Sequence, residues 1–169
     1  EAWAIEQAAK REREESKKAR MAARVEKAKD RQKLEAMKSV ARLIADAQVP
    51  FNAFIRERDK DKGCFVCGRP FLANVPGRVQ HAGHVRSRGA AGHLRFHEDN
   101  CHGECEGCNG PNGAKPHQIK AGAIARIGQK RFEALENDNT PRKWDKDELR
   151  AIKALYVQKL KDLRKAKQA

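Results

Sequence analysis

Apolar residues are sparse over the first 33 positions of the chain and then adopt a helical spacing. Residues 1–48 are rich in Ala, Glu, Lys, Arg and Gln, with no Gly or Pro before Pro50, which predicts one long helix. The spacing then predicts a packed helical face made of Leu34, Met37, Val40, Ala41, Ile44 and Ala47. We therefore expect residues 11–33 to project into solvent or onto a partner. A coiled-coil dimer is the alternative, although no sustained heptad supports it.

Helical patterns return on the far side of a central region that is rich in Gly, Pro, Cys and His. We expect Pro50 to end the first helix, followed by a short apolar turn at residues 51–56. Residues 119–135 predict another helix, and Asp145 with Glu148 has the spacing of a capping box for a final one. Residues 63–116 have the composition of loops and short strands. The pattern predicts an α+β chain with a charged helical arm (1–48), a small core (49–116) and a C-terminal helical region (117–169).

The composition indicates that this core is small. Charged residues make up 36% of the chain and aromatic residues only 5%. A core of this kind usually needs a metal or another cross-link to hold its shape. No long apolar run and no signal-peptide pattern is visible, so we expect no membrane insertion. Five cysteines without a secretion signal favour a reducing compartment such as the cytoplasm, where thiols bind metal.

The charge is concentrated in the cysteine-rich centre. The formal net charge is +14, and residues 60–131 carry 12 basic residues against 5 acidic ones. This is the largest excess of any segment. A basic field of this kind favours nucleic acid as the partner, since a membrane anchor is not expected.

Two Cys-x2-Cys pairs are the strongest motif in the chain. Cys64 and Cys67 form the first pair, and Cys105 and Cys108 form the second, with 37 residues between the two pairs. Each pair presents two thiolates from a tight turn, and two such turns complete a tetrahedral shell for Zn²⁺. A closed four-thiolate site has no open coordination position, so we expect this zinc to be structural. Cys101 is left over and is interpreted as a bystander.

The segment between the cysteine pairs, with the residue just after the second pair, holds the candidate chemistry. His81 and His84 come first, 15 residues separate His84 from Asn100, and eight residues separate Asn100 from Asn109. This His…Asn…Asn spacing, enclosed by two Cys-x2-Cys pairs, resembles the motif of HNH endonucleases. The resemblance implies a zinc-stapled ββα-metal core, in which a β-hairpin carries the first His and a following helix supplies the last residue.

Several blocks also resemble the NinG/Rap recombination proteins of lambdoid phages. These blocks run from about residue 51 to 163 and are Phe51–Asp59, Ala82–His84, Leu94–Phe96, Cys105–Asn109, Arg126–Gly128 and Lys159–Leu163. The resemblance implies a DNA endonuclease that acts on branched recombination intermediates, D-loops and Holliday-type junctions. It further implies Mg²⁺ or Mn²⁺ as the catalytic ion, and action in the cytoplasm of a bacterial host.

The resemblance assigns a role to each residue of the motif. His84 would be the general base, because an imidazole titrates near ambient pH. Asn100 would orient His84 through backbone hydrogen bonds. Asn109 and His81 would hold the catalytic divalent ion. His81 stands where relatives often have Asp, and imidazole favours transition metals over Mg²⁺.

The remaining basic residues leave several interpretations open. Arg86, Arg88 and Arg95 follow the candidate base and could bind phosphate, or they could be solvated charges. Asn112 stands where the family tends to have Lys, which removes one phosphate contact.

A non-catalytic zinc-ribbon DNA-binding module is the main alternative function, and a helical scaffold is the third. A homodimer would suit two-fold cutting of a junction, but no residue pattern decides the oligomeric state.

Overall fold

The computed structural model describes residues 2–168, and these fall into two compact units that meet between Ser39 and Val40. The first unit is built from α1 (Ala2–Met37), whose side chains are almost all exposed. Among the described residues, no helix is both long and apolar enough to cross a membrane. The three-part division at residues 48 and 116 stays a prediction.

Helix α2 (Val40–Asp59) passes straight through Pro50, so the prediction that Pro50 ends the first helix was wrong. The helix is interrupted earlier, at Lys38 and Ser39. A proline inside a helix removes one backbone hydrogen bond and costs about 3 kcal/mol. Here Pro50 is itself buried, on a face that also buries Leu43, Ala47, Phe51, Phe54 and Ile55. Burial of this face offsets the cost of the proline.

The packed face also lies further along the chain than the sequence suggested. Leu34 and Met37 are 67% and 79% exposed, so neither contributes to a core. The buried stripe begins at Leu43, and of the six residues expected to pack only Ala47 is fully buried. Ile44 packs against the same core, so the predicted packed face is confirmed at Ile44 and Ala47 and was wrong at Leu34 and Met37.

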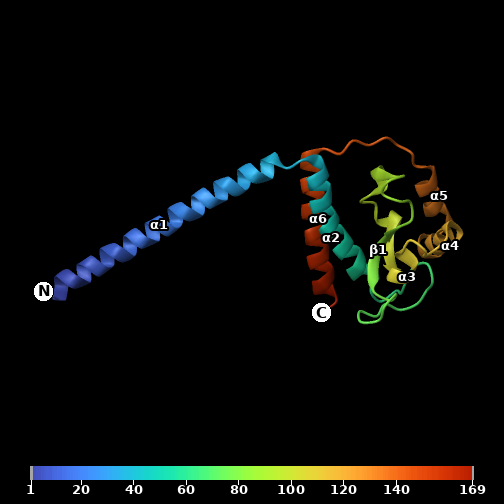
Figure 1. Cartoon of the computed structure of the whole chain (residues 1–169), viewed down its shortest axis with the longest axis horizontal. Helices are drawn as coiled ribbons and strands as arrows, with labels where there is room; N and C mark the ends of the chain where they lie inside the picture. The colour runs from blue at the N-terminus through green and yellow to red at the C-terminus, as the bar shows by residue number, and fades with distance from the viewer. Residues whose placement is uncertain (1, 169) are drawn as a thin grey trace. The chain divides into compact units, whose positions relative to one another are not determined.

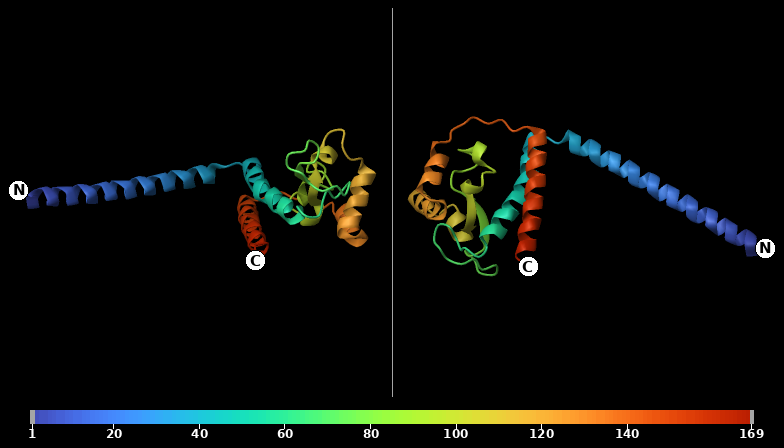
Figure 2. Two further views of the ribbon diagram at one scale, coloured as in Figure 1. Left: turned by 90° about the horizontal axis from the view of Figure 1, so that it is seen from below. Right: turned by 180° about the vertical axis from the view of Figure 1, so that it is seen from behind.

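Helix α6 (Lys146–Ala166) packs beside α2, as the ribbon views show (Figures 1 and 2). The side chain of Asp145 accepts hydrogen bonds from the backbone N–H groups of Asp147 and Glu148, which confirms the predicted start of this helix. Leu149 and Tyr156 are buried against α2 in the largest apolar cluster of the protein. Helix α2, with α6 packed on it, contacts both strands of the small sheet.

The sheet has two antiparallel strands, β1 (Gln80–His84) and β2 (Cys101–Cys105), with His84 opposite Cys101. The connection between them contains two short 3-10 helices, η1 (Gly92–Leu94) and η2 (Glu98–Asn100). The single-turn helix α3 (Glu106–Asn109) follows β2 directly. The fold is therefore mixed and dominated by helices, with a strand–strand–helix order at its centre.

Two helices follow where the sequence predicted one continuous helix over residues 119–135. These are α4 (Pro116–Ile127) and α5 (Gln129–Asn137), and they are separated by Gly128 at φ +83°. This backbone conformation is costly for residues other than glycine, so Gly128 ends α4. Ala123 of α4 and Phe132 of α5 pack against Phe65, beside the first cysteine pair.

Candidate active site and metal centre

The four paired cysteines form one cluster. The Sγ atoms of Cys64, Cys67, Cys105 and Cys108 all lie within 4.8 Å of one another, and the Cys67–Cys105 distance is 3.8 Å. A tetrahedral zinc ion with Zn–S bonds of about 2.3 Å places its sulfur atoms about 3.8 Å apart. The cluster therefore fits a metal ion, and its all-sulfur donor set is consistent with Zn²⁺.

Local backbone geometry creates this cluster. The N–H of Gly68 donates to the carbonyl of Cys64 (2.9 Å), which closes the first turn, and Gly68 has φ +72°. The second pair lies at the end of β2 and in α3. The N–H of Cys105 also points to Sγ of Cys64 at 3.4 Å. The metal centre thus ties the loop before the sheet to the end of the sheet.

Asn100 is fully buried beside the start of β2 and makes three hydrogen bonds to backbone. Its Oδ1 accepts from the N–H of Arg86 (2.8 Å), and its Nδ2 donates to the carbonyls of Arg86 (3.0 Å) and Leu94 (3.2 Å). The carbonyl of Asn100 accepts from the N–H of Val85 at 2.9 Å. Asn100 therefore holds the segment after β1 in one conformation.

His84 ends β1 and is half-buried. Its Nε2 lies 3.0 Å from the carbonyl oxygen of Arg95. A carbonyl only accepts, so Nε2 carries the proton and Nδ1 keeps the lone pair, with Sγ of Cys101 3.8 Å away. Burial, together with the nearby Arg88 and Arg95, lowers the pKa of His84 below its usual range. The ring is neutral at neutral pH, which is the protonation state of a general base.

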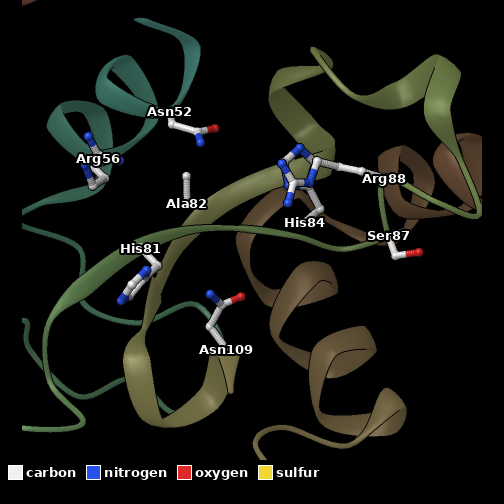
Figure 3. Close-up of a pocket in the computed structure, with 8 residues that line it drawn as sticks. All are labelled: Asn52, Arg56, His81, Ala82, His84, Ser87, Arg88 and Asn109. Carbon is white, nitrogen blue, oxygen red and sulfur yellow. The ribbon is translucent and has the colours of Figure 1, made fainter. Parts of the chain in front are cut away.

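A cavity of about 360 Å³ brings the candidate residues together, and we call it the His84 cavity (Figure 3). Its lining consists of Asn52, Arg56, His81, Ala82, His84, Ser87, Arg88 and Asn109. Among these described residues there is no carboxylate. Two arginines and two imidazoles therefore meet here without an acidic counter-charge, an arrangement that favours an anionic ligand.

His81 and Asn109 reach this cavity from different elements (Figure 3). A separation of three residues places His81 and His84 on opposite faces of a regular strand. Both nevertheless line the cavity, since His84 is the last residue of β1. Asn109 is the last residue of the single-turn helix α3 and is exposed. Asn109 therefore lies at the end of the short helix that directly follows β2, and the next helix begins at Pro116.

The three candidate phosphate-binding arginines lie in different surroundings. The guanidinium of Arg86 donates to the carbonyls of Leu135 (2.7 Å) and Asp138 (2.6 Å) at the end of α5, and to Asn139. These internal acceptors occupy it, so Arg86 acts as a cap for α5. Arg88 is exposed and lines the His84 cavity. Arg95 lies next to that cavity, with its Nη1 3.4 Å from Oε1 of Gln48.

Comparison with known proteins identifies the family. The family model described as "Bacteriophage Lambda NinG protein" matches residues 2–167. The chain belongs to the NinG family. It is similar to "Protein ninG" of Escherichia phage 933W, with 40% identity over 141 residues (82% of this chain and 68% of that protein). Its identity to the proteins of that name in Escherichia phage lambda and Salmonella phage P22 is 39% and 40%, over 62% and 61% of their lengths. No solved structure matches the chain.

Two cavity residues of this NinG-family chain were missed by sequence reasoning. Asn52 and Arg56 both line the His84 cavity from α2. They lie four residues apart and so share one helical face. Both fall inside the block Phe51–Asp59 that carries the NinG/Rap resemblance, but no chemical pattern singled them out. Their place in the site depends on the packing of α2 beside β1.

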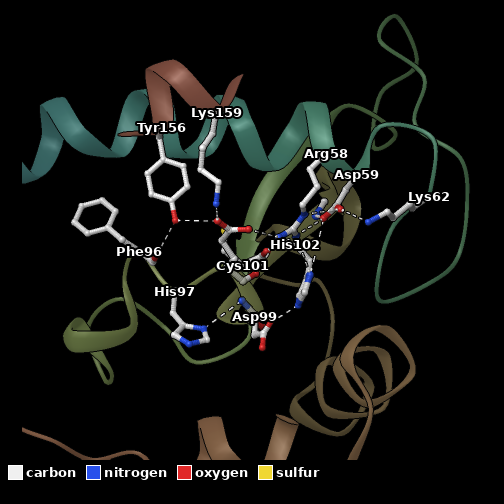
Figure 4. Close-up of polar contacts among 12 residues, drawn as sticks. Arg58, Asp59, Lys62, Phe96, His97, Asp99, Cys101, His102, Tyr156 and Lys159 are labelled. Carbon is white, nitrogen blue, oxygen red and sulfur yellow. Dashed lines mark hydrogen bonds and ion pairs between the residues drawn. The ribbon is translucent and has the colours of Figure 1, made fainter. Parts of the chain in front are cut away.

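A second polar cluster, on α2 and β2, is structural (Figure 4). Asp59 is fully buried, accepts two hydrogen bonds from Arg58 (2.9 and 2.7 Å) and one from the N–H of Gly103 (2.9 Å), and pairs with Lys62. Nη2 of Arg58 also lies 3.2 Å from Nδ1 of His102. Burial and Arg58 lower the pKa of His102 to about 4. The neutral His102 therefore has a structural role in this buried polar cluster.

Proposed function

We propose that this protein is a structure-specific DNA endonuclease that hydrolyses phosphodiester bonds in branched recombination intermediates, D-loops and Holliday-type junctions. The observation that carries the proposal is the His84 cavity, where a neutral imidazole meets two arginines without a carboxylate. The chain belongs to a phage protein family, and the resemblance of its His84, Asn100 and Asn109 spacing to the HNH motif supports the nuclease assignment. The formal net charge of +14 supports a polyanionic substrate.

In the proposed reaction, Nδ1 of His84 takes a proton from a water molecule as that water attacks the phosphorus atom. The P–O bond to the leaving oxygen breaks, and the leaving oxygen collects a proton from solvent. The carbonyl of Arg95 holds the ring through Nε2, and Asn100 holds the segment on which Arg95 is carried. Asn100 is thus a positioning residue, and His84 is the catalytic one.

His81 and Asn109 are the cavity residues that would hold the catalytic divalent ion. When bound, such an ion stabilises the negative charge on the phosphate and on the leaving oxygen. The available donors are an imidazole nitrogen and an amide oxygen. Mg²⁺ usually takes carboxylate ligands, whereas imidazole suits transition metals. The donor set therefore fits Mn²⁺ better than Mg²⁺.

The four-cysteine cluster has a separate role in this proposal. Its all-sulfur shell is closed, so the zinc would be structural and would fix β2 and α3 beside the catalytic residues. Arg56 and Arg88 would bind the phosphate backbone from the two sides of the cavity. Arg86 is not included, since its guanidinium is already bound to the end of α5.

Cleavage of an end-labelled immobile four-way junction tests the proposal, with a linear duplex of the same sequence as the comparison. We expect the junction to be cut, and to be cut faster with Mn²⁺ than with Mg²⁺. His81→Asp supplies a carboxylate and should shift the preference towards Mg²⁺. Binding without cleavage under both ions would overturn the proposal in favour of a non-catalytic zinc-ribbon module.

A further inference from the structure

A second cavity adjoins the His84 cavity and has an unusual lining. Its volume is about 410 Å³, and we call it the Arg95 cavity. It is lined by Ala41, Ile44, Ala45, Gln48, Val49, Asn52, Arg88 and Arg95. Asn52 and Arg88 line both cavities, so the two are continuous. A ligand that extends out of the His84 cavity along α2 enters the Arg95 cavity.

One face of α2 runs along both cavities. The α2 residues that line the Arg95 cavity recur at helical spacing, from Ala41 to Asn52, and the face continues to Arg56 in the His84 cavity. Within this face Val49 is 70% exposed. The groove therefore has an apolar wall at one end and a polar, basic wall at the other, which suits a sugar–phosphate unit.

Arg95 has an incomplete set of hydrogen bonds. Its Nε is buried, and no acceptor in the described part of the chain pairs with it. Its Nη1 makes only the long contact to Gln48. A buried donor of a charged group that lacks a partner is costly, which favours the binding of an acceptor at this position.

No acidic side chain offsets the charge of this groove. Among the described residues that line the Arg95 cavity none is a carboxylate, and Arg88 approaches Arg95 closely enough to lower its pKa, in addition to the effect of burial. Two cations held together in this way are stabilised by an anion between them. The charges of Arg88 and Arg95 both lie close enough to His84 to lower its pKa, so this anion would lie near the catalytic base.

We propose that the Arg95 cavity seats the nucleotide next to the cleaved phosphodiester, with Arg88 and Arg95 binding its phosphate and Ala45 and Val49 contacting its sugar. The cavity volume falls in the range of about 300–1,000 Å³ typical of pockets for single small ligands, so it accommodates one nucleotide unit rather than a duplex. This inference rests on the proposed nuclease function and adds a binding subsite to it.

Binding of a fluorescent four-way junction, measured by anisotropy without added divalent ion and at several salt concentrations, tests the subsite. Arg95→Gln should weaken binding roughly tenfold, as expected for a charge-assisted hydrogen bond. It should also reduce the salt dependence by about one counterion, since one phosphate contact contributes a slope of about 0.9. Lys161→Gln, on the exposed face of α6, removes the same charge and is the control.

A second pair of variants tests the subsite even if Arg95→Gln does not fold. Val49→Glu places a carboxylate in the groove at an exposed helical position, and Val157→Glu makes the same change on α6, where Val157 is 52% exposed. We expect Val49→Glu to weaken junction binding at least fivefold relative to Val157→Glu. Equal binding by the two variants would overturn the subsite.

Neutral methylphosphonate linkages, placed one at a time across the branch point, identify the phosphate that Arg95 contacts. One linkage near the branch point should weaken binding of the wild-type protein but not of Arg95→Gln. Equal loss for both proteins at every position would contradict the assignment. All three tests measure binding alone, so they separate the subsite from the proposed nuclease function. A wild-type protein that shows these effects but never cuts fails as a nuclease, while one that cuts without them lacks the subsite.

Discussion

Substitution of Asn100 by alanine provides a demanding test of how the site is built. Asn100 is fully buried and makes three side-chain hydrogen bonds to the backbone of the segment that follows β1. Each such bond contributes a net stability of about 1 kcal/mol. The sum of about 3 kcal/mol is a large fraction of the 5–15 kcal/mol that is typical of a domain. We therefore expect Asn100→Ala to remain folded but to be strongly destabilised.

Urea unfolding followed by tryptophan fluorescence measures this loss. Trp144 packs edge-on against Phe96, with ring centroids 5.1 Å apart, and so reports on the segment that Asn100 anchors. A Trp3→Phe background silences the other tryptophan, which is 73% exposed on α1. Asn74→Ala, in the exposed loop before β1, is the control. A loss below about 1 kcal/mol, no larger than that of Asn74→Ala, would refute the structural role of Asn100.

Three further predictions concern stability. The buried ion pairs of Asp59 hold its pKa well below the usual range, so they stabilise the fold above the unfolded-state pKa and this stability is lost as the pH falls. Asp59→Asn should lower the free energy of unfolding by about 3–5 kcal/mol at pH 7. In urea unfolding, the difference in this free energy between the variant and the wild type should shrink below pH 4. A difference that does not change with pH would contradict the prediction. Removing zinc with a chelator, or Cys67→Ser, should lower both zinc stoichiometry and melting temperature, whereas an unchanged melting temperature would argue against a structural metal. Gly122→Ala should destabilise the protein by more than about 1 kcal/mol, because its Cβ atom would lie 2.2 Å from the carbonyl oxygen of Phe65. Gly92→Ala is the control, since a Cβ atom there has open space. Equal melting temperatures for the two variants would contradict the packing at Gly122.

Local chemical signals predicted several features that the structure confirms. The Cys-x2-Cys spacing predicted the four-cysteine cluster, because two tight turns can bring four thiols together wherever the chain between them goes. The Asp145 cap predicted the start of α6, because the side chain bonds to backbone only two and three residues away. Both features depend on a few neighbouring residues, which is why they can be read without the fold.

Features that depend on tertiary packing were not predictable in the same way. Pro50 remains inside α2 because burial against α6 outweighs the lost hydrogen bond, and the sequence does not show that neighbour. Asn52 and Arg56 enter the His84 cavity only because α2 packs beside β1. Arg86 resembled a phosphate ligand in the sequence, but the end of α5 supplies its acceptors from about 50 residues away.

The single-turnover cleavage rate of a saturated four-way junction tests the central claim most directly, with wild-type protein and His84→Ala compared under Mn²⁺. A general base contributes roughly 10²–10⁴-fold to a rate, so His84→Ala should lose at least 100-fold while binding the junction with unchanged affinity. His117→Ala removes an exposed imidazole from α4 and should cut at the wild-type rate. Equal rates for His84→Ala and His117→Ala would contradict the assignment of His84 as the catalytic base.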